Sequence, residues 1–337
     1  MGKREKLHMA AFLLLALCLV LTAWAVFDRK TSCWYTEKVR GFYQESKQSM
    51  DVIGFGSSRM YCTLDPLVLH HKTGLRAYVL ATQQQPLKAT WYYMREALER
   101  QSPRLLILEA TMAFRPDSEI TDAEIRDCLD PLPWSKNKLT LIRELVPAGQ
   151  RAAYYFNFLK YHQRWKELSA KDFDFSYLGK RDVFRGYMYL TPERGADCRQ
   201  QSYDSVEALS IPEENLALLR EMAQLAEENG ASLLLLAAPY EAVTDDLGYL
   251  RSLHAFCEAE GIAFLDLNLV YDELGIDNGK DFFDIGHFNV SGSTKATKYI
   301  ADYISRNYAL SPIPDAELDA ELKQAYEDWI VHPPVIE

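Results

Sequence analysis

The stretch that says most about the fold is Asp51-Val52-Ile53-Gly54-Phe55-Gly56-Ser57-Ser58-Arg59-Met60-Tyr61. The apolar run from Val52 to Phe55 is typical of a buried strand, and the apolar spacing after Gly56 suits a helix. A strand that turns sharply into a helix at a glycine and a hydroxyl residue can present a serine nucleophile at the carboxyl edge of a sheet. Glycine and serine also form ordinary turns and caps, so this stretch alone leaves both interpretations open.

Short apolar runs with helical patterns between them recur along the chain. The strands are predicted at 51–55, 77–81, 104–109, 232–237 and 263–267, and the helices at about 60–71, 86–101, 212–229, 247–260 and 293–307. Strands that are apolar along their length and alternate with helices are typical of a parallel sheet covered on both faces. The predicted fold class is therefore α/β, a three-layer αβα sandwich with a doubly wound, mostly parallel five-stranded sheet.

A membrane segment is predicted at the N-terminus. The run from Met9 to Phe27 carries no charge and is long enough to cross the roughly 30 Å hydrocarbon core of a bilayer. The basic residues Lys3, Arg4 and Lys6 favour a cytoplasmic tip (1–8), a single transmembrane signal anchor (9–27) in the plasma membrane and an extracytoplasmic domain. Ala23-Trp24-Ala25 leaves a cleaved signal peptide open as the alternative.

The remaining chain divides into three parts. A polar stalk is predicted at 28–50, a globular domain at 51–310 and a C-terminal tail at 311–337. The domain contains a large insertion at about 112–211, far longer than a connection between a strand and a helix requires. A helix rich in aromatic residues is predicted within it at about 151–168. Its rings either pack the insertion onto the sheet or form a platform for sugar rings.

Composition limits the function classes. The chain has 337 residues with 48% hydrophobic and 25% charged residues, which is ordinary for a globular protein with a full core. Its net charge of -11 argues against a nucleic-acid partner, because phosphate binding requires basic surfaces. The six cysteines have irregular spacing, so neither a disulfide framework nor a zinc site is predicted. No metal and no organic cofactor is implied.

A candidate base follows the fifth predicted strand. Asp284 and His287 lie three residues apart, a spacing at which one carboxylate can orient an imidazole whose other nitrogen faces a serine. The motif lies between the last strand and the last helix, on the sheet edge where Ser58 is expected. This placement favours Ser58, Asp284 and His287 as one catalytic site.

Gly56-Ser57-Ser58 and Asp284-x-x-His287 resemble the first and last blocks of the SGNH (GDSL-type) hydrolase family. The flanking sequence resembles membrane-anchored bacterial members, including the D-alanyl transfer protein of teichoic acid synthesis and cell-surface polysaccharide acetyl-modifying proteins. The resemblance covers about 50–110 and 210–307. It implies a flavodoxin-like SGNH fold in which Ser58 is the nucleophile, His287 the base and Asp284 its orienting acid.

The chain departs from the family pattern at the oxyanion donors. The family uses a glycine after the second strand and an asparagine after the third, whereas this chain has Gln83 and Gln84 at the first place and no asparagine at the second. Gln83 and Gln84 are therefore the candidate oxyanion donors. Arg185 in the insertion is a candidate for clamping an anionic substrate group, with a local hydrogen-bonding role as the alternative.

These residues and the predicted anchor favour an extracytoplasmic serine esterase or acyltransferase, and the resemblance implies that it acts on O-acyl groups, with acetyl expected, of a cell-envelope glycan. The expected partners are an acylated polysaccharide or teichoic acid and the membrane. One alternative is acyl or D-alanyl transfer together with a membrane acyl-donor protein. The other is a non-catalytic glycan-binding or assembly protein on the same fold.

Overall fold

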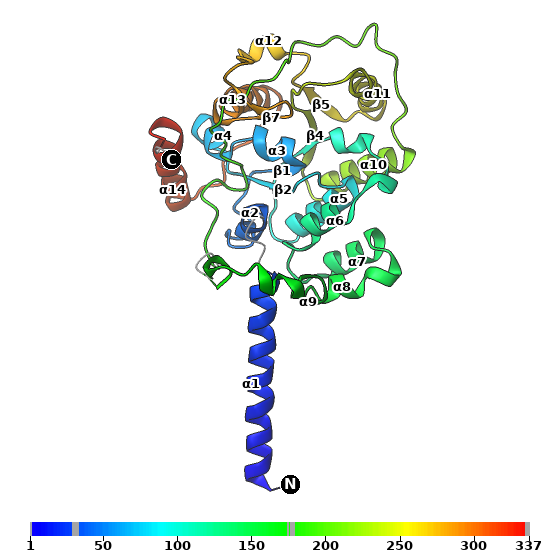
Figure 1. Cartoon of the computed structure of the whole chain (residues 1–337). Helices are drawn as coiled ribbons and strands as arrows, with labels where there is room; N and C mark the ends of the chain where they lie inside the picture. The colour runs from blue at the N-terminus through cyan, green and yellow to red at the C-terminus, as the bar shows by residue number, and fades with distance from the viewer. Residues whose placement is uncertain (1, 29–33, 174, 176–178, 334–337) are drawn as a thin grey trace.

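The computed structural model describes residues 2–28, 34–173, 175 and 179–333, and its centre is a parallel sheet. The strands are β1 (Val52–Gly56), β2 (Ala77–Ala81), β3 (Leu105–Glu109), β4 (Ser232–Ala237) and β5 (Ala263–Asp266). Their order is β2-β1-β3-β4-β5, and every neighbouring pair is parallel. The predicted α/β sandwich with a five-stranded sheet is confirmed (Figure 1).

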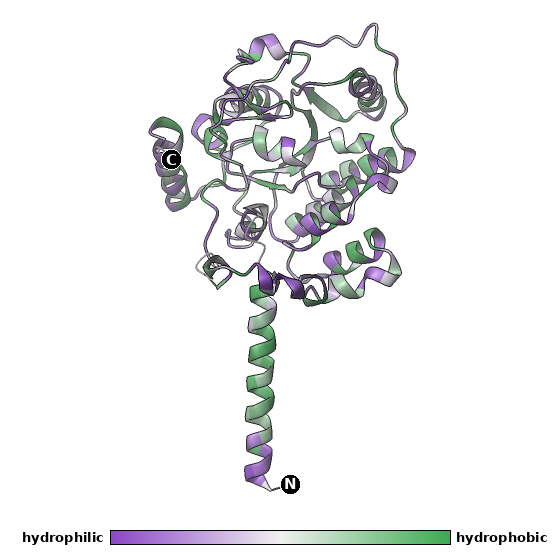
Figure 2. Ribbon diagram, in the orientation of Figure 1, coloured by the Kyte–Doolittle hydropathy of each residue, from purple (hydrophilic) through white to green (hydrophobic). Residues whose placement is uncertain are grey.

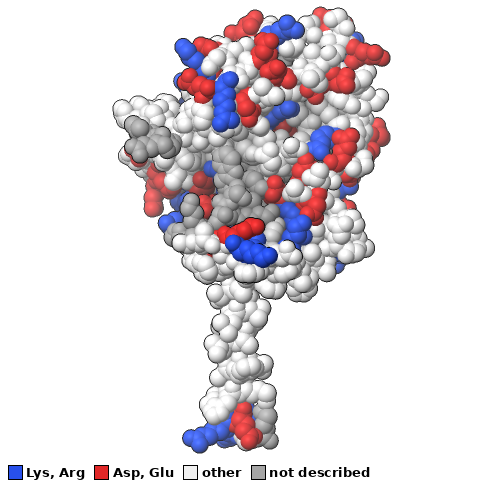
Figure 3. Space-filling view, in the orientation of Figure 1, with Lys and Arg blue, Asp and Glu red and all other residues white. Residues whose placement is uncertain are grey.

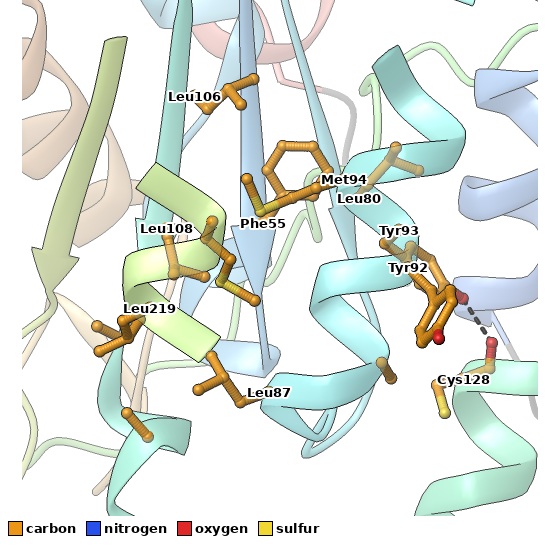
Figure 4. Close-up of a cluster of buried hydrophobic side chains, with 14 of the residues drawn as sticks. Phe55, Leu80, Leu87, Tyr92, Tyr93, Met94, Leu106, Leu108, Cys128 and Leu219 are labelled. Carbon is orange, nitrogen blue, oxygen red and sulfur yellow. Dashed lines mark hydrogen bonds between the residues drawn. The ribbon is translucent and has the colours of Figure 1, made fainter. Parts of the chain in front are cut away.

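Helices cover both faces of the sheet because successive strand residues point to opposite sides. Ile53 and Phe55 pack on one side, whereas Val52 packs on the other. The first side holds α2 (Trp34–Phe42), α5 (Leu87–Leu98), α10 (Glu213–Glu228) and α11 (Thr244–Glu260). The second side holds α3 (Ser58–Thr63), α4 (Pro66–Thr73), α12 (Tyr271–Leu274) and α13 (Val290–Asn307). Figure 4 shows part of the first core, where Phe55 and Met94 meet.

The helix predicted at 60–71 is two helices in the structure. Asp65 lies between α3 and α4, where its side chain accepts a hydrogen bond from the Leu67 N–H at 2.8 Å. Pro66 is the first residue of α4, where a proline fits well because that position needs no N–H donor. The Asp-Pro pair therefore starts a new helix and turns the chain back toward β2.

The N-terminal helix α1 (Lys3–Asp28) projects from the domain, and its middle is uniformly hydrophobic (Figure 2). By length and composition Lys3–Phe27 is a candidate membrane span. The segment predicted as a polar stalk is not free of the domain, since Val39 and Phe42 of α2 are buried in the core beside β2. Residues 29–33 lie outside the described residues.

The insertion between β3 and α10 has short helices up to Phe173, and its described residues from 179 to 212 form neither helix nor strand. The helices are η1 (Thr111–Phe114), η2 (Asp117–Glu119), α6 (Asp122–Leu129), α7 (Lys136–Leu145), η3 (Ala148–Gln150), α8 (Ala152–Tyr155), α9 (Phe158–Tyr161), η4 (His162–Lys166) and η5 (Ala170–Phe173). The single helix predicted at 151–168 is interrupted at Phe156, whose backbone leaves the helical region. The Tyr93 hydroxyl donates a 2.7 Å hydrogen bond to the Cys128 carbonyl and ties the insertion to α5 (Figure 4).

The C-terminal part adds two features. An antiparallel pair, β6 (Phe282–Asp284) and β7 (His287–Phe288), precedes α13. Helix α14 (Ala316–Tyr326), followed by a turn of π-helix at Glu327–Val331, packs on α4. Leu318 and Leu322 are buried there against Leu67 and Val68. The region predicted as a tail thus covers the outer surface of α4.

Candidate active site

The turn that follows β1 places Ser58 at the carboxyl edge of the sheet. Gly56 has a φ of +141°, and a Cβ there would lie 2.9 Å from the Cβ of Glu109 on β3. Only glycine fits this conformation and this close approach without strain. Ser57 then takes the N-cap position of α3, and Ser58 is its first residue, with an exposed fraction of 7%. The local sequence thus brings a serine hydroxyl to the surface of a rigid β-to-helix turn.

The β6–β7 pair carries the other two candidate catalytic side chains. Asp284 and His287 are opposite each other in this antiparallel pair, and their side chains meet at 2.8 Å between Oδ1 and Nδ1. The Gly286 N–H also donates to Asp284 Oδ1 at 2.8 Å. Asn289 caps α13 and donates to the Lys280 carbonyl at 2.6 Å, which fixes the start of the following helix. The carboxylate and the imidazole are therefore held by local backbone structure.

The structure brings Ser58, His287 and Asp284 into one chain of hydrogen-bond contacts. His287 Nε2 lies 2.7 Å from Ser58 Oγ, and Nδ1 contacts Asp284 on the other side of the ring. With the proton on Nδ1, Nε2 is free to accept the serine proton. This is the arrangement that activates a serine nucleophile by an oriented general base.

A cavity of about 280 Å³ opens in front of Ser58. Its walls come from the ends of several strands and from the start of the insertion. They are formed by Ser57, Ser58, Arg59, Gln83, Gln84, Thr111, Met112, Phe114, Arg115, Tyr240, Asp246, Gly286 and His287. A cavity at the carboxyl ends of parallel strands is where ligands bind in open α/β sheets.

Gln83 and Gln84 both lie in this cavity wall. The Tyr61 hydroxyl donates to Gln83 Oε1 at 2.8 Å, which leaves the Gln83 amide N–H groups as the outward donors. Gln84 has a φ of 41° and its Oε1 accepts from Arg115 at 3.1 Å. Each glutamine thus has its oxygen engaged and its NH₂ group available for donation.

Arg185 lies away from the cavity. Its guanidinium is buried and contacts Glu45 at 2.9 Å and Glu321 at 2.8 Å. Its carbonyl accepts from the Val79 N–H at 2.8 Å, so the segment pairs with the outer edge of β2. Burial is the main reason that the pKa of Glu45 is raised to about 7, and Arg185 opposes that rise. The structure therefore gives Arg185 a structural ion pair and does not bring it to Ser58.

Two cavity residues that sequence analysis missed are Arg59 and Tyr240. The Arg59 guanidinium lies 3.4 Å from the centroid of the Tyr240 ring, and Tyr240 is 5% exposed. Arg59 lines the cavity, and its charge opposes the rise that burial causes in the pKa of Glu109. Arg59 could have been identified from the sequence because it directly follows Ser58. No sequence motif marks Tyr240, which follows β4.

Glu109 is a third missed residue, and it lies behind the cavity wall. It is fully buried, and burial raises the pKa of its carboxyl. Thr111 Oγ1 donates to it at 2.7 Å, and Ser57 Oγ donates at 3.4 Å. Glu109 thus connects the end of β3 to the residue before Ser58, at the end of the strand where the family resemblance implied an asparagine.

Cys62 is the described thiol closest to Ser58 in the sequence, and its environment does not favour a thiolate. Cys18, Cys62, Cys128, Cys198 and Cys257 are free thiols. Burial raises the pKa of the Cys62 thiol well above its ordinary value, so this neighbour of Ser58 on α3 stays protonated. Within the described ranges, no cluster of three His, Cys, Asp or Glu side chains could hold a metal ion.

Comparison with known proteins gives similarity to solved structures alone. No family model matches the sequence, and no curated protein sequence matches it. One similar structure is a candidate acylhydrolase from Bacteroides fragilis, with 12% identity, coverage of 82% of this chain and 99% of that chain, and a TM-score of 0.39. Another is the lipase/acylhydrolase from Enterococcus faecalis, with 12% identity, coverage of 79% and 100%, and a TM-score of 0.34.

Proposed function

We propose that this protein is a membrane-anchored serine esterase or acyltransferase of the SGNH type, with Ser58, His287 and Asp284 as its catalytic residues. The observation that carries the proposal is the 2.7 Å contact between Ser58 Oγ and His287 Nε2, together with the 2.8 Å contact between His287 and Asp284. A structural histidine would need neither a serine hydroxyl as its partner nor a cavity in front of it.

The reaction begins when Ser58 Oγ attacks the carbonyl carbon of an ester. His287 Nε2 takes the serine proton, and Asp284 stabilises the resulting imidazolium. The tetrahedral intermediate collapses when the bond to the leaving oxygen breaks and His287 returns its proton to that oxygen. The acyl group then remains on Ser58 until water or another hydroxyl attacks it, with His287 again acting as base.

The oxyanion is stabilised by the Ser58 N–H and by the amide of Gln83 or Gln84. Both glutamines line the cavity and have their oxygen atoms engaged elsewhere, which directs an NH₂ group to the substrate. One such donor contributes about 3 kcal/mol of transition-state stabilisation. A glutamine after the second strand thus replaces the asparagine that is missing after the third.

The proposed substrate is an O-acyl group, with acetyl expected, on a cell-envelope glycan or teichoic acid. A cavity of about 280 Å³ is at the small end for ligand pockets, which favours a short acyl chain. The apolar helix α1 supports a location at the plasma membrane, with the catalytic domain on the extracytoplasmic side. Hydrolysis and transfer share the same acyl-enzyme, and a membrane acyl-donor protein is the partner that transfer requires.

The test uses the full chain purified in detergent. A fluorophosphonate probe should label the wild type and not Ser58→Ala, and p-nitrophenyl acetate hydrolysis should fall in parallel. Ser205→Ala is the matched control, because Ser205 is exposed and lies outside the cavity wall, and it should keep labelling. Labelling with negligible hydrolysis would favour transfer. A folded protein that binds glycan without labelling of Ser58 would overturn the proposal and favour a non-catalytic role.

A further inference from the structure

Exposed aromatic and apolar side chains gather on one segment of the insertion. We call them the aromatic surface, and its members are Phe156, Phe158, Leu159, Trp165 and Phe173. Their exposed fractions range from 43% to 64%. Soluble domains seldom leave such a group of large apolar side chains in water, so a surface of this kind marks a contact with a partner or a membrane.

The aromatic surface adjoins the end of α1. The rings of Trp24 and Phe156 are 6.2 Å apart, and the rings of Phe27 and Phe158 meet edge to face at 5.5 Å. The Arg164 guanidinium donates to the Phe27 carbonyl at 2.7 Å. Figure 1 shows α9 beside the point where α1 enters the domain. The aromatic surface therefore continues the apolar surface of α1 outward onto the domain.

The orientation of this segment is fixed by its inner side. Tyr154 is buried with its hydroxyl on Asp122, and Tyr161 is buried with its hydroxyl on Asp130. The Arg126 guanidinium lies 3.6 Å from the Tyr154 ring centroid and is buried beneath it. Aromatic residues of one segment are thus divided into an anchored inner set and the exposed aromatic surface. The exposed set consequently has a defined direction and does not result from loose packing.

Charge supports a lipid partner over a sugar partner. Figure 3 shows that α1 carries charged side chains at its N-terminal tip and none from there to the domain. The aromatic surface begins where this uncharged length ends. In the same segment Lys160 pairs with Asp122 and Arg164 pairs with Asp172, and the Lys166 ammonium lies 5.5 Å from the Trp165 ring centroid. Aromatic rings with nearby cations are typical of the boundary between the acyl chains and the headgroups.

We infer that the aromatic surface inserts into the headgroup region of the bilayer that α1 spans, so that the domain rests on the membrane at this point. The inference rests on one part of the proposed function, namely that α1 anchors the protein in the membrane. The partner is the lipid bilayer itself, and none of the residues involved touches the Ser58 cavity. Among the described helical segments, α9, η4 and η5 contact α1, which ties the aromatic surface to the membrane-spanning helix.

The test measures the depth of Trp165. The full chain is placed in lipid nanodiscs of phosphatidylcholine that is unlabelled or carries bromine near the headgroup or near the bilayer centre. Subtraction of the Trp165→Phe spectrum from the wild-type spectrum gives the emission of Trp165, and shallow bromine should quench this emission by at least about half. Bromine near the bilayer centre should quench it less.

Trp91→Phe provides the matched control, because Trp91 lies on α5 against the domain core. The emission assigned to Trp91 should not respond to bromine at either depth. Equal responses of Trp165 and Trp91 would overturn the inference. Trp165 emission that aqueous acrylamide quenches in nanodiscs as strongly as it quenches free tryptophan would overturn it as well. A contact with a membrane protein instead of lipid would give the same negative result, because no such partner is present in the bilayer of the nanodiscs. None of these readouts depends on whether Ser58 reacts.

Discussion

His287 Nε2 lies 2.7 Å from Ser58 Oγ, although the two residues are 229 positions apart in the chain. Ser58 is held by the turn after β1, whereas His287 is held by the β6–β7 pair and by the capped start of α13. The turn after β1 lies at the carboxyl edge of the parallel sheet, and the β6–β7 pair places His287 at the same edge. Local backbone structure therefore orients each of the two side chains.

Asp284→Asn tests whether the carboxylate orients His287. The substitution keeps the size of the side chain but allows its amide to donate to Nδ1, which would favour the wrong imidazole tautomer. We expect kcat for an acetyl ester to fall about 10²–10⁴-fold with little change in KM. Asp272→Asn, on the exposed surface of α12, is the control. An Asp284→Asn enzyme with wild-type kcat would remove Asp284 from the mechanism.

Gln83→Ala and Gln84→Ala identify the oxyanion donor. The variant that removes the donor should lose about 10²–10³-fold in kcat, because the interaction forms only in the transition state. The other variant serves as its control and should change kcat by less than about tenfold. Steady-state kinetics with p-nitrophenyl acetate measure both. If neither variant affects kcat, the second oxyanion donor is neither of these residues.

Gly56→Ala should destabilise the fold and the site together. The φ of +141° is strained for alanine, and the new Cβ would meet the backbone and Cβ of Glu109 at about 3 Å. A loss of about 2–4 kcal/mol in the free energy of unfolding is expected. Gly149→Ala is the control, because a Cβ there meets no atom within 4 Å. Thermal unfolding in detergent compares them, and equal midpoints for the two variants would contradict this account of the turn.

Asp65 should make stability depend on pH. Burial raises the pKa of this carboxyl from 3.8 to about 7, against the effect of its backbone hydrogen bonds. The folded protein therefore binds a proton that the unfolded chain releases. The resulting stability is fully present below about pH 3.8 and is lost as the pH rises through about 7.

Between pH 5 and pH 8 the unfolding temperature of the wild type should fall, and that of Asp65→Asn should fall by roughly 5 °C less. Asparagine keeps the cap of α4 while removing the charge. Glu45 and Glu109 also have raised pKa values, so the comparison with Asp65→Asn isolates the contribution of one carboxyl. Parallel curves for the two proteins would show that Asp65 is not the titrating group.

The sheet and the contact between Ser58 and His287 could be predicted because they follow from strong local patterns. A short apolar run such as that from Ser232 to Ala237 is typical of a strand covered on both faces. The carboxyl ends of parallel strands lie at one edge of the sheet, so residues that follow them come close together. The break at Asp65-Pro66 was also available in the sequence, and the error lay in extending one helix across it.

The placement of the insertion could not be predicted in the same way. The Arg185 carbonyl accepts a hydrogen bond from Val79 of β2. Its guanidinium pairs with Glu321 of α14, which lies 136 residues further along the chain. Such pairings depend on the path of long connections and not on local periodicity. Phe156 and Tyr154 show the same limit, since neighbouring aromatic residues end on opposite sides of one segment, and only the folded path determines which is exposed.

The position of the β6–β7 pair late in the chain also determines when the proposed site can form. During synthesis Ser58 emerges early, while Asp284 and His287 emerge only after all five strands of the parallel sheet have been made. Until that point a growing chain has Ser58 without its proposed base. If Ser58 is the nucleophile, an acyl donor met earlier would therefore not be consumed by an incomplete protein.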